Sequence, residues 1–267
     1  GIDGGPKSAG EGDDATLVVD GLSLSAWPSA FRPGNSSSEL VFVALPPGLH
    51  FTPVEQQIQR SESAPPGLDV LFADEHVVVV CKPYGLPTEN TLHIKDSIAS
   101  RARERFGSMT VVHRLDWETS GVLILAKTSL AAKRLSQQFR SAVCSKYYIA
   151  VVRGHIKAGR GIVQLPLRPD VDRPPLQQID LVGGKPSTSA WRVLSKGEHT
   201  TRLLLEAVTG RRHQLRVHMA ALGHPIIGDG LYDAEHSAHR LHLHATCVAF
   251  AHPASNDTIR IRSEPPF

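Results

Sequence analysis

Residues 113–121, HRLDWETSG, form a polar run between two apolar segments and carry the groups best suited to chemistry. Valines precede the run and VLIL follows it, a pattern that predicts a loop held between two β-strands. Asp116 stands near the centre of this loop, two residues after Arg114 and shortly before Thr119. A carboxylate that a rigid scaffold presents on a loop is well placed for catalysis. The alternative is a structural role, because loop aspartates usually accept hydrogen bonds from their own turn.

A second informative stretch, residues 209–232, contains three arginines around a short apolar pattern. Apolar residues at three- and four-residue spacing predict a helix over 212–222, which ends before a glycine and a proline. Arg212 and Arg216 are four residues apart, so such a helix presents both guanidinium groups on one face. A guanidinium supplies both charge and orientation to a buried carboxylate. We therefore expect Arg216 to hold Asp116 ionised, with a solvated or phosphate-facing arginine as the alternative.

Tyr148 lies in a β-prone run over 147–152. The plain interpretation is a half-buried strand aromatic with its hydroxyl at the surface. A functional tyrosine offers a ring that stacks on a base and a hydroxyl, of pKa ~10, that can pass a proton in a tuned environment.

The fourteen histidines suggest a metal site, and four of them gather near the C-terminal end at positions 236, 239, 242 and 244. No acidic residue stands at ligand spacing beside them and no HExxH motif is present, so no metal is expected. No local signature of a serine or cysteine nucleophile appears. The three cysteines are widely spaced, which indicates free thiols in a reducing compartment.

The charge of the chain is divided unevenly. Residues 1–66 contain eight acidic and three basic side chains, so the net charge of +3 leaves +8 on residues 67–267. A basic region of this size suits a polyanion such as nucleic acid. No apolar run approaches the ~18 residues of a membrane span, and the start does not resemble a secretory signal. We expect no membrane association and a cytoplasmic location, with an organelle as the alternative if a targeting segment has been removed.

Two regions are expected along the chain. Residues 1–66 predict an N-terminal extension, partly disordered and of unknown role, with a Pro-rich linker near its end. Residues 67–267 predict one domain in which a Gly- and Pro-rich excursion over 155–187 lies outside the core, apart from a short β-like piece over 163–167. Its other expected elements are a hairpin over 68–81, helices over 96–106 and 128–140, and strands over 147–152, 189–194, 201–207, 241–250 and 258–261.

Several of these segments resemble the motifs of RluA-type pseudouridine synthases, whose hallmark is an HRLDxxTSG loop. The matching segments follow the order of that family and are KPYGLP (82–87), HRLDWETSG (113–121), KYYIAVVRG (146–154), QLPL (164–167), GKP (184–186), GRRHQLRVHMAALGHPIIGDGLY (210–232) and LHLHA (241–245). The resemblance covers Leu68 to Phe267 and is closest to members without an S4 module. It implies an α+β fold with a mixed, largely antiparallel curved sheet, flanking helices and a basic active-site cleft, which agrees with the order of the expected elements.

The resemblance also implies a reaction, the conversion of uridine in tRNA or rRNA stem-loops into its C-glycoside isomer, without cofactor or metal, by a protein expected to be a monomer. It implies three catalytic residues, Asp116, Tyr148 and Arg216. The residues expected to contact the RNA substrate are Arg114, which would help displace the target base, and His113, Thr119, Lys146, Arg212 and His213. Further phosphate contacts are expected from Arg101, Arg103, Arg105, Lys133 and Arg134.

Two other functions stay open at this point. One is a catalytically silent RNA-binding relative, against which the complete set of three catalytic residues argues. The other is a metal-dependent phosphoesterase built on the aspartate and histidine clusters, whose activity a chelator would remove.

Overall fold

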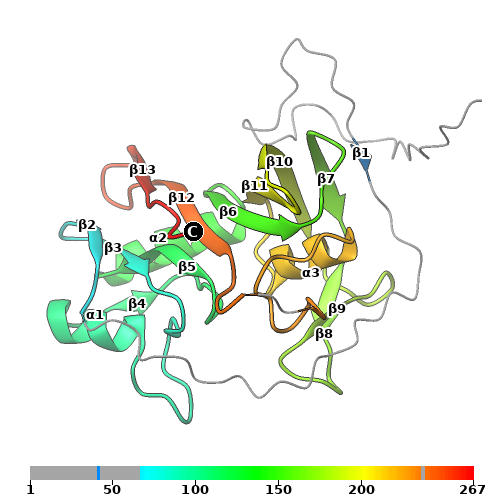
Figure 1. Ribbon diagram of the computed structural model, residues 1–267. Coiled ribbons are helices and arrows are strands. Elements are labelled where there is room, and N and C mark those ends of the chain that lie inside the picture. The colour runs from blue at the N-terminus through cyan, green and yellow to red at the C-terminus, as the bar shows by residue number, and fades with distance from the viewer. Residues whose placement is uncertain (1–40, 43–66, 236–237) are drawn as a thin grey trace, which may run out of the picture.

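The computed structural model describes residues 41–42, 67–235 and 238–267 of the chain (Figure 1). The predicted β-runs and linker of residues 1–66 lie outside the described residues, apart from positions 41, 42 and the boundary. The helices are α1 (Ile98–Phe106), α2 (Ser129–Arg140) and α3 (Gln214–Ala221). The strands are β1 (Val41–Phe42), β2 (Val70–Ala73), β3 (Val77–Lys82), β4 (Thr110–Val111), β5 (Ser120–Ala126), β6 (Ser145–Arg153), β7 (Arg160–Gln164), β8 (Leu167–Pro169), β9 (Gln177–Ile179), β10 (Thr188–Lys196), β11 (Thr200–Ala207), β12 (Leu243–Ala251) and β13 (Thr258–Arg262).

Eleven of these strands form one sheet in the order β1-β7-β10-β11-β6-β12-β5-β3-β2, with β13 paired to β12 and β4 to β5. Strands β8 and β9 form a separate small sheet. Neighbours in the large sheet run antiparallel except β1 with β7 and β5 with β12. The expected α+β fold with a mixed, largely antiparallel sheet is therefore confirmed.

Helices α1 and α2 cover opposite faces of the sheet around β3 and β5. The four residues Val77–Val80 of β3 are all fully buried, because alternate valines point to the two faces and each face has a helix against it. One set packs with Leu135 of α2 and the other with Ile98 of α1. This double cover makes β3 and β5 a rigid support for the loop that precedes β5.

Polar caps fix where α1 and α2 begin. The Ser97 side chain accepts a hydrogen bond from the backbone N–H of Ser100, whose hydroxyl in turn accepts one from the N–H of Ser97. The Thr128 hydroxyl accepts a hydrogen bond from the N–H of Ala131 at the start of α2. Both helices end where their sequence patterns predicted.

Helix α3 is shorter than predicted. It begins at Gln214, after His213 adopts a left-handed backbone conformation with φ of 53°. Arg212 therefore precedes the helix, and the prediction that it shares a helix face with Arg216 is wrong. The apolar stripe is confirmed, because Leu215 and its neighbours one turn later pack on the β10–β11 part of the sheet.

The segment 155–187 contributes more to the core than the sequence indicated. Strand β7 lies inside the sheet between β1 and β10. The β8–β9 hairpin buries Leu167 and Leu176 against Val217 of α3 and Tyr232. The predicted β-like piece over 163–167 overlaps the end of β7 and the start of β8. Prolines and glycines interrupt the apolar pattern elsewhere, so the prediction of a non-core excursion is wrong for the rest of these strands.

Two cores on one face of the sheet meet at Tyr148 of β6. The ring packs against the cluster under α3 and against the cluster under α1. In the part of the chain that the structure describes, no helix is long and apolar enough to cross a membrane.

Candidate active site

The HRLDWETSG loop joins β4 to β5, as predicted, and its exit is fixed by a close backbone approach. Ser120 and Gly121 pair in parallel with His244 and Ala245 of β12. Gly121 has φ of 113°, and a Cβ atom there would lie 2.3 Å from the carbonyl oxygen of Ala245. Only glycine satisfies both the conformation and the space, which explains its place at the end of the motif.

Hydrogen bonds from the KPYGLPT segment (82–88) hold the backbone of the HRLDWETSG loop. The Thr88 hydroxyl accepts a hydrogen bond from the N–H of Leu115 at 3.2 Å and donates one to its carbonyl at 2.9 Å. Lys82 is fully buried and its ammonium donates to the carbonyls of Pro83, Leu86 and Trp117. These contacts on either side of Asp116 leave its backbone little freedom.

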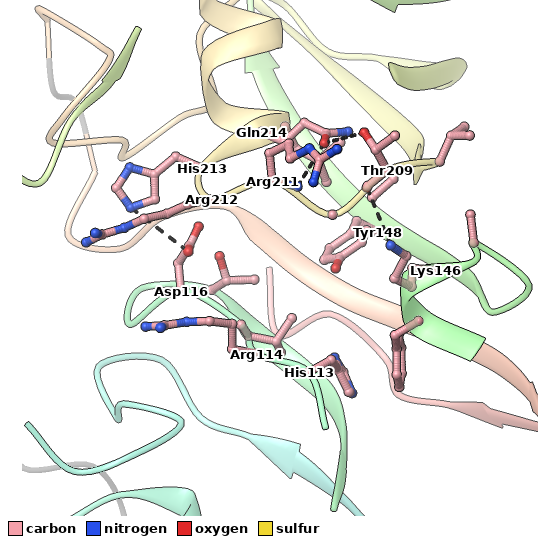
Figure 2. A pocket seen from close by; sticks show the side chains of 18 of the residues that line it. His113, Arg114, Asp116, Lys146, Tyr148, Thr209, Arg211, Arg212, His213 and Gln214 are labelled. Atoms are coloured by element: carbon pink, nitrogen blue, oxygen red, sulfur yellow. Dashed lines mark hydrogen bonds and ion pairs between the residues drawn. The ribbon is translucent and has the colours of Figure 1, made fainter. Parts of the chain in front are cut away.

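A pocket of about 530 Å³ lies in front of this loop (Figure 2). All nine sequence-predicted site residues line it, namely His113, Arg114, Asp116, Thr119, Lys146, Tyr148, Arg212, His213 and Arg216. Two more cations, Arg140 and Arg211, line the same pocket. The expected basic cleft around Asp116 is therefore present, and its size is within the range of small-molecule sites.

Asp116 projects into this cleft with 20% of its side chain exposed. Burial raises the pKa of its carboxyl, and Arg216, Arg114, Arg212 and Lys82 oppose that rise through their charges. In the part of the chain that the structure describes, no group donates a hydrogen bond to this carboxylate. Among the described residues, the basic side chain within 4.0 Å of this carboxylate is His213, whose Nε2 atom lies 4.0 Å from Oδ1 (Figure 2).

Arg216 is 1% exposed and its guanidinium is held by two other carboxylates. Nε and Nη2 donate to the two oxygens of Asp229 at 2.8 and 2.6 Å, and Nη2 lies 2.7 Å from Oε2 of Glu118. Asp116 is beyond ion-pair distance and acts on Arg216 through the longer-range field, which contributes to a raised pKa of the arginine. The expected influence of Arg216 on Asp116 is thus electrostatic in this structure.

His213 is positioned by Tyr232. Its Nδ1 atom lies 2.8 Å from the Tyr232 hydroxyl oxygen, and the N–H of Gln177 donates a hydrogen bond to the same oxygen at 2.8 Å. Burial and the charges of Arg216 and Arg212 lower the pKa of His213 to about 3, so the ring is neutral at physiological pH.

Tyr148 and Lys146 leave the same face of β6, two residues apart, and both reach the cleft (Figure 2). Burial and the charge of Asp116 raise the pKa of the Tyr148 hydroxyl above its usual value, so it is a protonated donor at neutral pH. The Lys146 ammonium donates to the carbonyl of Thr209 at 3.4 Å, a long contact.

His113 and Arg114 lie next to each other but have different surroundings. The Nε2 atom of His113 accepts a hydrogen bond from the N–H of Ile124, and its ring stacks on Phe139 with centroids 4.2 Å apart. Arg114 is exposed at the mouth of the cleft. Thr119 is 2% exposed, and its hydroxyl has no partner among the described residues.

The residues predicted to make further phosphate contacts do not line the pocket, namely Arg101, Arg103, Arg105, Lys133 and Arg134. Arg101 pairs with Asp96, and Arg105 and Arg134 donate to backbone carbonyls. Among the described residues, no three histidine, cysteine, aspartate or glutamate side chains come together as a metal site.

Several site residues were missed from the sequence, chiefly Glu118, Asp229, Tyr232, Lys82 and Thr88. Asp229 and Tyr232 belong to the GDGLY end of the second motif, where an aspartate between glycines signals a turn that accepts backbone hydrogen bonds. The Asp229 carboxylate indeed accepts the N–H groups of Leu231 and Tyr232 besides Arg216. Glu118 lies in the HRLDWETSG loop, but its partner Arg216 is distant in the chain and no local pattern indicated the ion pair. The partner of Thr88, Leu115, is also distant in the chain.

Known proteins share the sequence and the fold that form this site. A family model described as RNA pseudouridylate synthase matches residues 76–221. The dual-specificity RNA pseudouridine synthase RluA of Pasteurella multocida is 41% identical over 76% of this chain and 95% of its own length, and that of Vibrio vulnificus is 43% identical over 72% and 80%.

Solved structures agree. Human RNA pseudouridylate synthase domain containing 1 is 29% identical with a TM-score of 0.65, covering 75% of this chain and 84% of its own. Human RNA pseudouridylate synthase domain containing 4 is 26% identical with a TM-score of 0.61, covering 74% and 88%. From the family match and the identity to relatives over most of their length, we conclude that the chain belongs to the RluA-type RNA pseudouridine synthases and is an isomerase.

Proposed function

We propose that this chain isomerises uridines in both tRNA and rRNA stem-loops, with Asp116 as the residue on which the reaction depends. The curated relatives named above carry the description dual-specificity, and their identity to this chain supports the same breadth. The observation that carries the proposal is a carboxylate without hydrogen-bond donors, within the described residues, at the bottom of a cationic cleft. Such a group is available to a substrate, whereas the cations attract phosphates.

The target uridine must first leave its stack to reach the carboxylate. Unstacking costs a few kcal/mol, which contacts made only by the displaced base and its backbone offset. We assign the displacing contact to Arg114, which is exposed at the mouth of the pocket, and phosphate contacts to Arg212 and Lys146. Thr119 supplies an unused hydroxyl deeper in the pocket.

The reaction then breaks the bond from N1 of uracil to C1′ of ribose, rotates the base and joins C5 to C1′. The proton of C5 leaves, and N1 gains one, so the product is an isomer. Asp116 acts at the sugar or the base in the first step, and the field of Arg216 keeps it ionised against the cost of burial. Tyr148 is a neutral donor beside Asp116 and takes part in the proton transfers of the last step.

His113 and His213 also have roles in the proposed reaction. His113 fixes the wall of the cleft through its contacts with β5 and Phe139. His213 contacts the substrate beside Asp116.

We also propose that residues 67–267 form the catalytic domain of a monomer that acts in the cytoplasm, where the three free cysteines stay reduced. Size-exclusion chromatography with light scattering tests the monomer.

The test is pseudouridine formation on total tRNA and on rRNA incubated with the pure protein and EDTA. Carbodiimide-dependent stops of reverse transcription mark each pseudouridine. Stops in both RNAs support the proposal, and stops in one RNA only would contradict dual specificity. RNA binding without any stop would favour the catalytically silent relative.

A further inference from the structure

Two hydrogen bonds connect the β8–β9 hairpin to the ring of His213, and this ring faces the carboxylate of Asp116. The backbone N–H of Gln177 donates to the Tyr232 hydroxyl, and this hydroxyl lies 2.8 Å from Nδ1 of His213. The opposite nitrogen of the ring, Nε2, lies 4.0 Å from Oδ1 of Asp116. One ring nitrogen of His213 is therefore hydrogen-bonded to a phenol, and the other faces a carboxylate beyond hydrogen-bond distance.

The two neighbours of the ring favour one tautomer. A neutral imidazole carries one proton, so one nitrogen donates and the other accepts. A carboxylate attracts an N–H and repels a lone pair, which places the proton on Nε2. The phenol complements this choice, because it has a proton to give to Nδ1 while its oxygen accepts from Gln177. The Arg216 guanidinium, 5.5 Å from the centre of the Tyr232 ring, strengthens the phenol as a donor.

The backbone of His213 shows that the ring is held in place. This residue has φ of 53°, a left-handed conformation that a non-glycine residue adopts at a cost of about 1 kcal/mol or more. Its side chain makes no capping hydrogen bond to α3, which is the usual reason for a polar residue at this position. The strained conformation instead points the ring, 5% exposed, between Tyr232 and Asp116. Such strain is frequent where a side chain must be aimed for function.

We propose that Tyr232 is a positioning residue, which holds His213 as the Nε2–H tautomer so that His213 donates a hydrogen bond to Asp116 when the substrate is bound. The inference rests on the proposed function for its catalytic meaning, although the tautomer itself does not depend on it. The distance of 4.0 Å is longer than a hydrogen bond, and catalytic contacts often shorten only in the substrate complex. The β8–β9 hairpin acquires a role, because it anchors the hydroxyl that sets the tautomer.

The direct test is nuclear magnetic resonance of the full chain labelled with ¹⁵N-histidine. Long-range correlations between ring protons and nitrogens distinguish the Nε2–H tautomer, the Nδ1–H tautomer and the imidazolium. The His213 pattern is assigned by its absence from the spectrum of His213→Gln. The proposal expects the Nε2–H pattern in the wild type at neutral pH, and either of the other two patterns would overturn it.

The variant Tyr232→Phe then tests what sets the tautomer. It keeps the ring that packs on Val217 and Leu167, and removes only the hydroxyl. We expect the His213 pattern to change to a mixture of tautomers, and an unchanged pattern would overturn the role of Tyr232. Tyr147→Phe is the matched control, because Tyr147 faces the other side of β6 and bonds to Glu206. It should leave the His213 pattern as in the wild type. If Tyr232→Phe fails to fold, the wild-type pattern still decides the tautomer.

Kinetics connect the tautomer to catalysis. Losing one orienting hydrogen bond should lower kcat about tenfold in Tyr232→Phe, with KM for RNA unchanged. His213→Gln places an amide N–H near the position of Nε2, whereas His213→Asn places it near Nδ1. The glutamine variant should therefore retain more activity than the asparagine variant, and the reverse order would contradict the proposal. A wild-type protein that modifies no RNA would refute the proposed function, while the resonance experiment would still decide the tautomer.

Discussion

Two aspartates near the same arginine are treated in opposite ways by the fold. Asp229, in the turn after α3, is fully buried and accepts hydrogen bonds from Nε and Nη2 of Arg216 and from two backbone N–H groups. Asp116, in the loop before β5, is partly exposed and, within the described residues, accepts none on its carboxylate. Glu118 lies between these extremes, with one ion pair to Arg216.

The difference separates structural from reactive groups. A buried carboxylate with all its acceptor sites filled stabilises a turn and an arginine, but it has nothing left for a substrate. A carboxylate held among cations without hydrogen-bond donors stays basic and available, at some cost to stability. The aspartate with fewer contacts is thus the one that we assign to the chemistry, and variants at both positions test this contrast.

The largest effect on stability is expected for Asp229→Asn. This change removes one of the two charges that compensate the buried Arg216, the one with two hydrogen bonds to it, so the free energy of unfolding should fall by about 3 kcal/mol. Asp116→Asn removes a carboxylate whose pKa burial raises, and should change stability by no more than about 1 kcal/mol, toward greater stability. Urea denaturation measures both. An equal loss of unfolding free energy in the two variants would contradict the distinction between a structural Asp229 and a reactive Asp116.

The next effect concerns the backbone support of the reactive loop. Thr88→Val keeps the shape of the side chain but leaves the N–H and carbonyl of Leu115 without partners, which should cost about 1–3 kcal/mol. Because this clamp lies next to Asp116, kcat should fall while RNA binding is kept. Thr128→Val, at the start of α2, is the matched control: it loses a cap at a cost of about 1 kcal/mol. A similar kcat for both variants, corrected for folded fraction, would contradict a specific role of the clamp.

Two arginines should separate stability from RNA binding. Arg114 is exposed and Arg216 is buried between two carboxylates. Arg114→Ala should leave the free energy of unfolding within about 0.5 kcal/mol of the wild type while lowering activity on structured RNA. Arg216→Lys loses the two-pronged contact with Asp229 and should be destabilised. Filter binding and thermal unfolding of the two variants measure the pattern, and a stability loss in Arg114→Ala would count against it.

The smallest effect is a shift of the pH–rate profile. If the ionised form of Asp116 is the active one, as we propose, the rate should rise with pH through the raised pKa of its carboxyl. Glu118→Gln removes one competitor for Arg216 and one nearby negative charge. The ionised form of Asp116 is then favoured, and the acid limb of kcat should move to lower pH, by about half a unit. A shift to higher pH would show that Glu118 supports the ionisation of Asp116.

The shifted pKa values of Asp116 and Lys82 should also make the stability of the protein depend on pH. A carboxyl whose pKa is raised by folding, as in Asp116, binds its proton more tightly in the native state, so its contribution falls as pH rises through the folded pKa. Lys82 behaves in the opposite sense, because burial lowers its pKa from 10.5 to about 7. Its contribution is present above 10.5 and is lost as pH falls toward 7. In Lys82→Met, unfolding measured between pH 7 and 10 should lack this rise with pH.

Much of this molecule follows from local patterns in the sequence. The four valines of β3, the caps of α1 and α2 and the polar run before β5 each act within a few residues, and their elements were predicted. The nine residues expected at the site all line one pocket. They could be predicted because the motifs that carry them are long and distinctive.

The failures have a common cause in distant contacts. The left-handed His213 shortens α3 at its start, and the contact with Tyr232 that explains it is nineteen positions away. Arg216 meets Asp229 and Glu118 more closely than Asp116, which no spacing reveals. Only a short piece over 163–167 was predicted as strand within 155–187, because prolines and glycines interrupt the pattern elsewhere and the burial of Leu167 and Leu176 depends on α3.

The most direct test of the account is tritium release from RNA that carries [5-³H]uridine, measured with wild-type protein and with Asp116→Asn at matched folded concentration. Release reports loss of the C5 proton, and filter binding of the same RNA reports affinity. We predict release with the wild type, none above background with Asp116→Asn, and RNA affinities that agree within a few fold, since one carboxylate contributes little to phosphate binding. Release that persists in Asp116→Asn would contradict the assignment of Asp116, and loss of binding in that variant would show that the loop serves mainly to hold RNA.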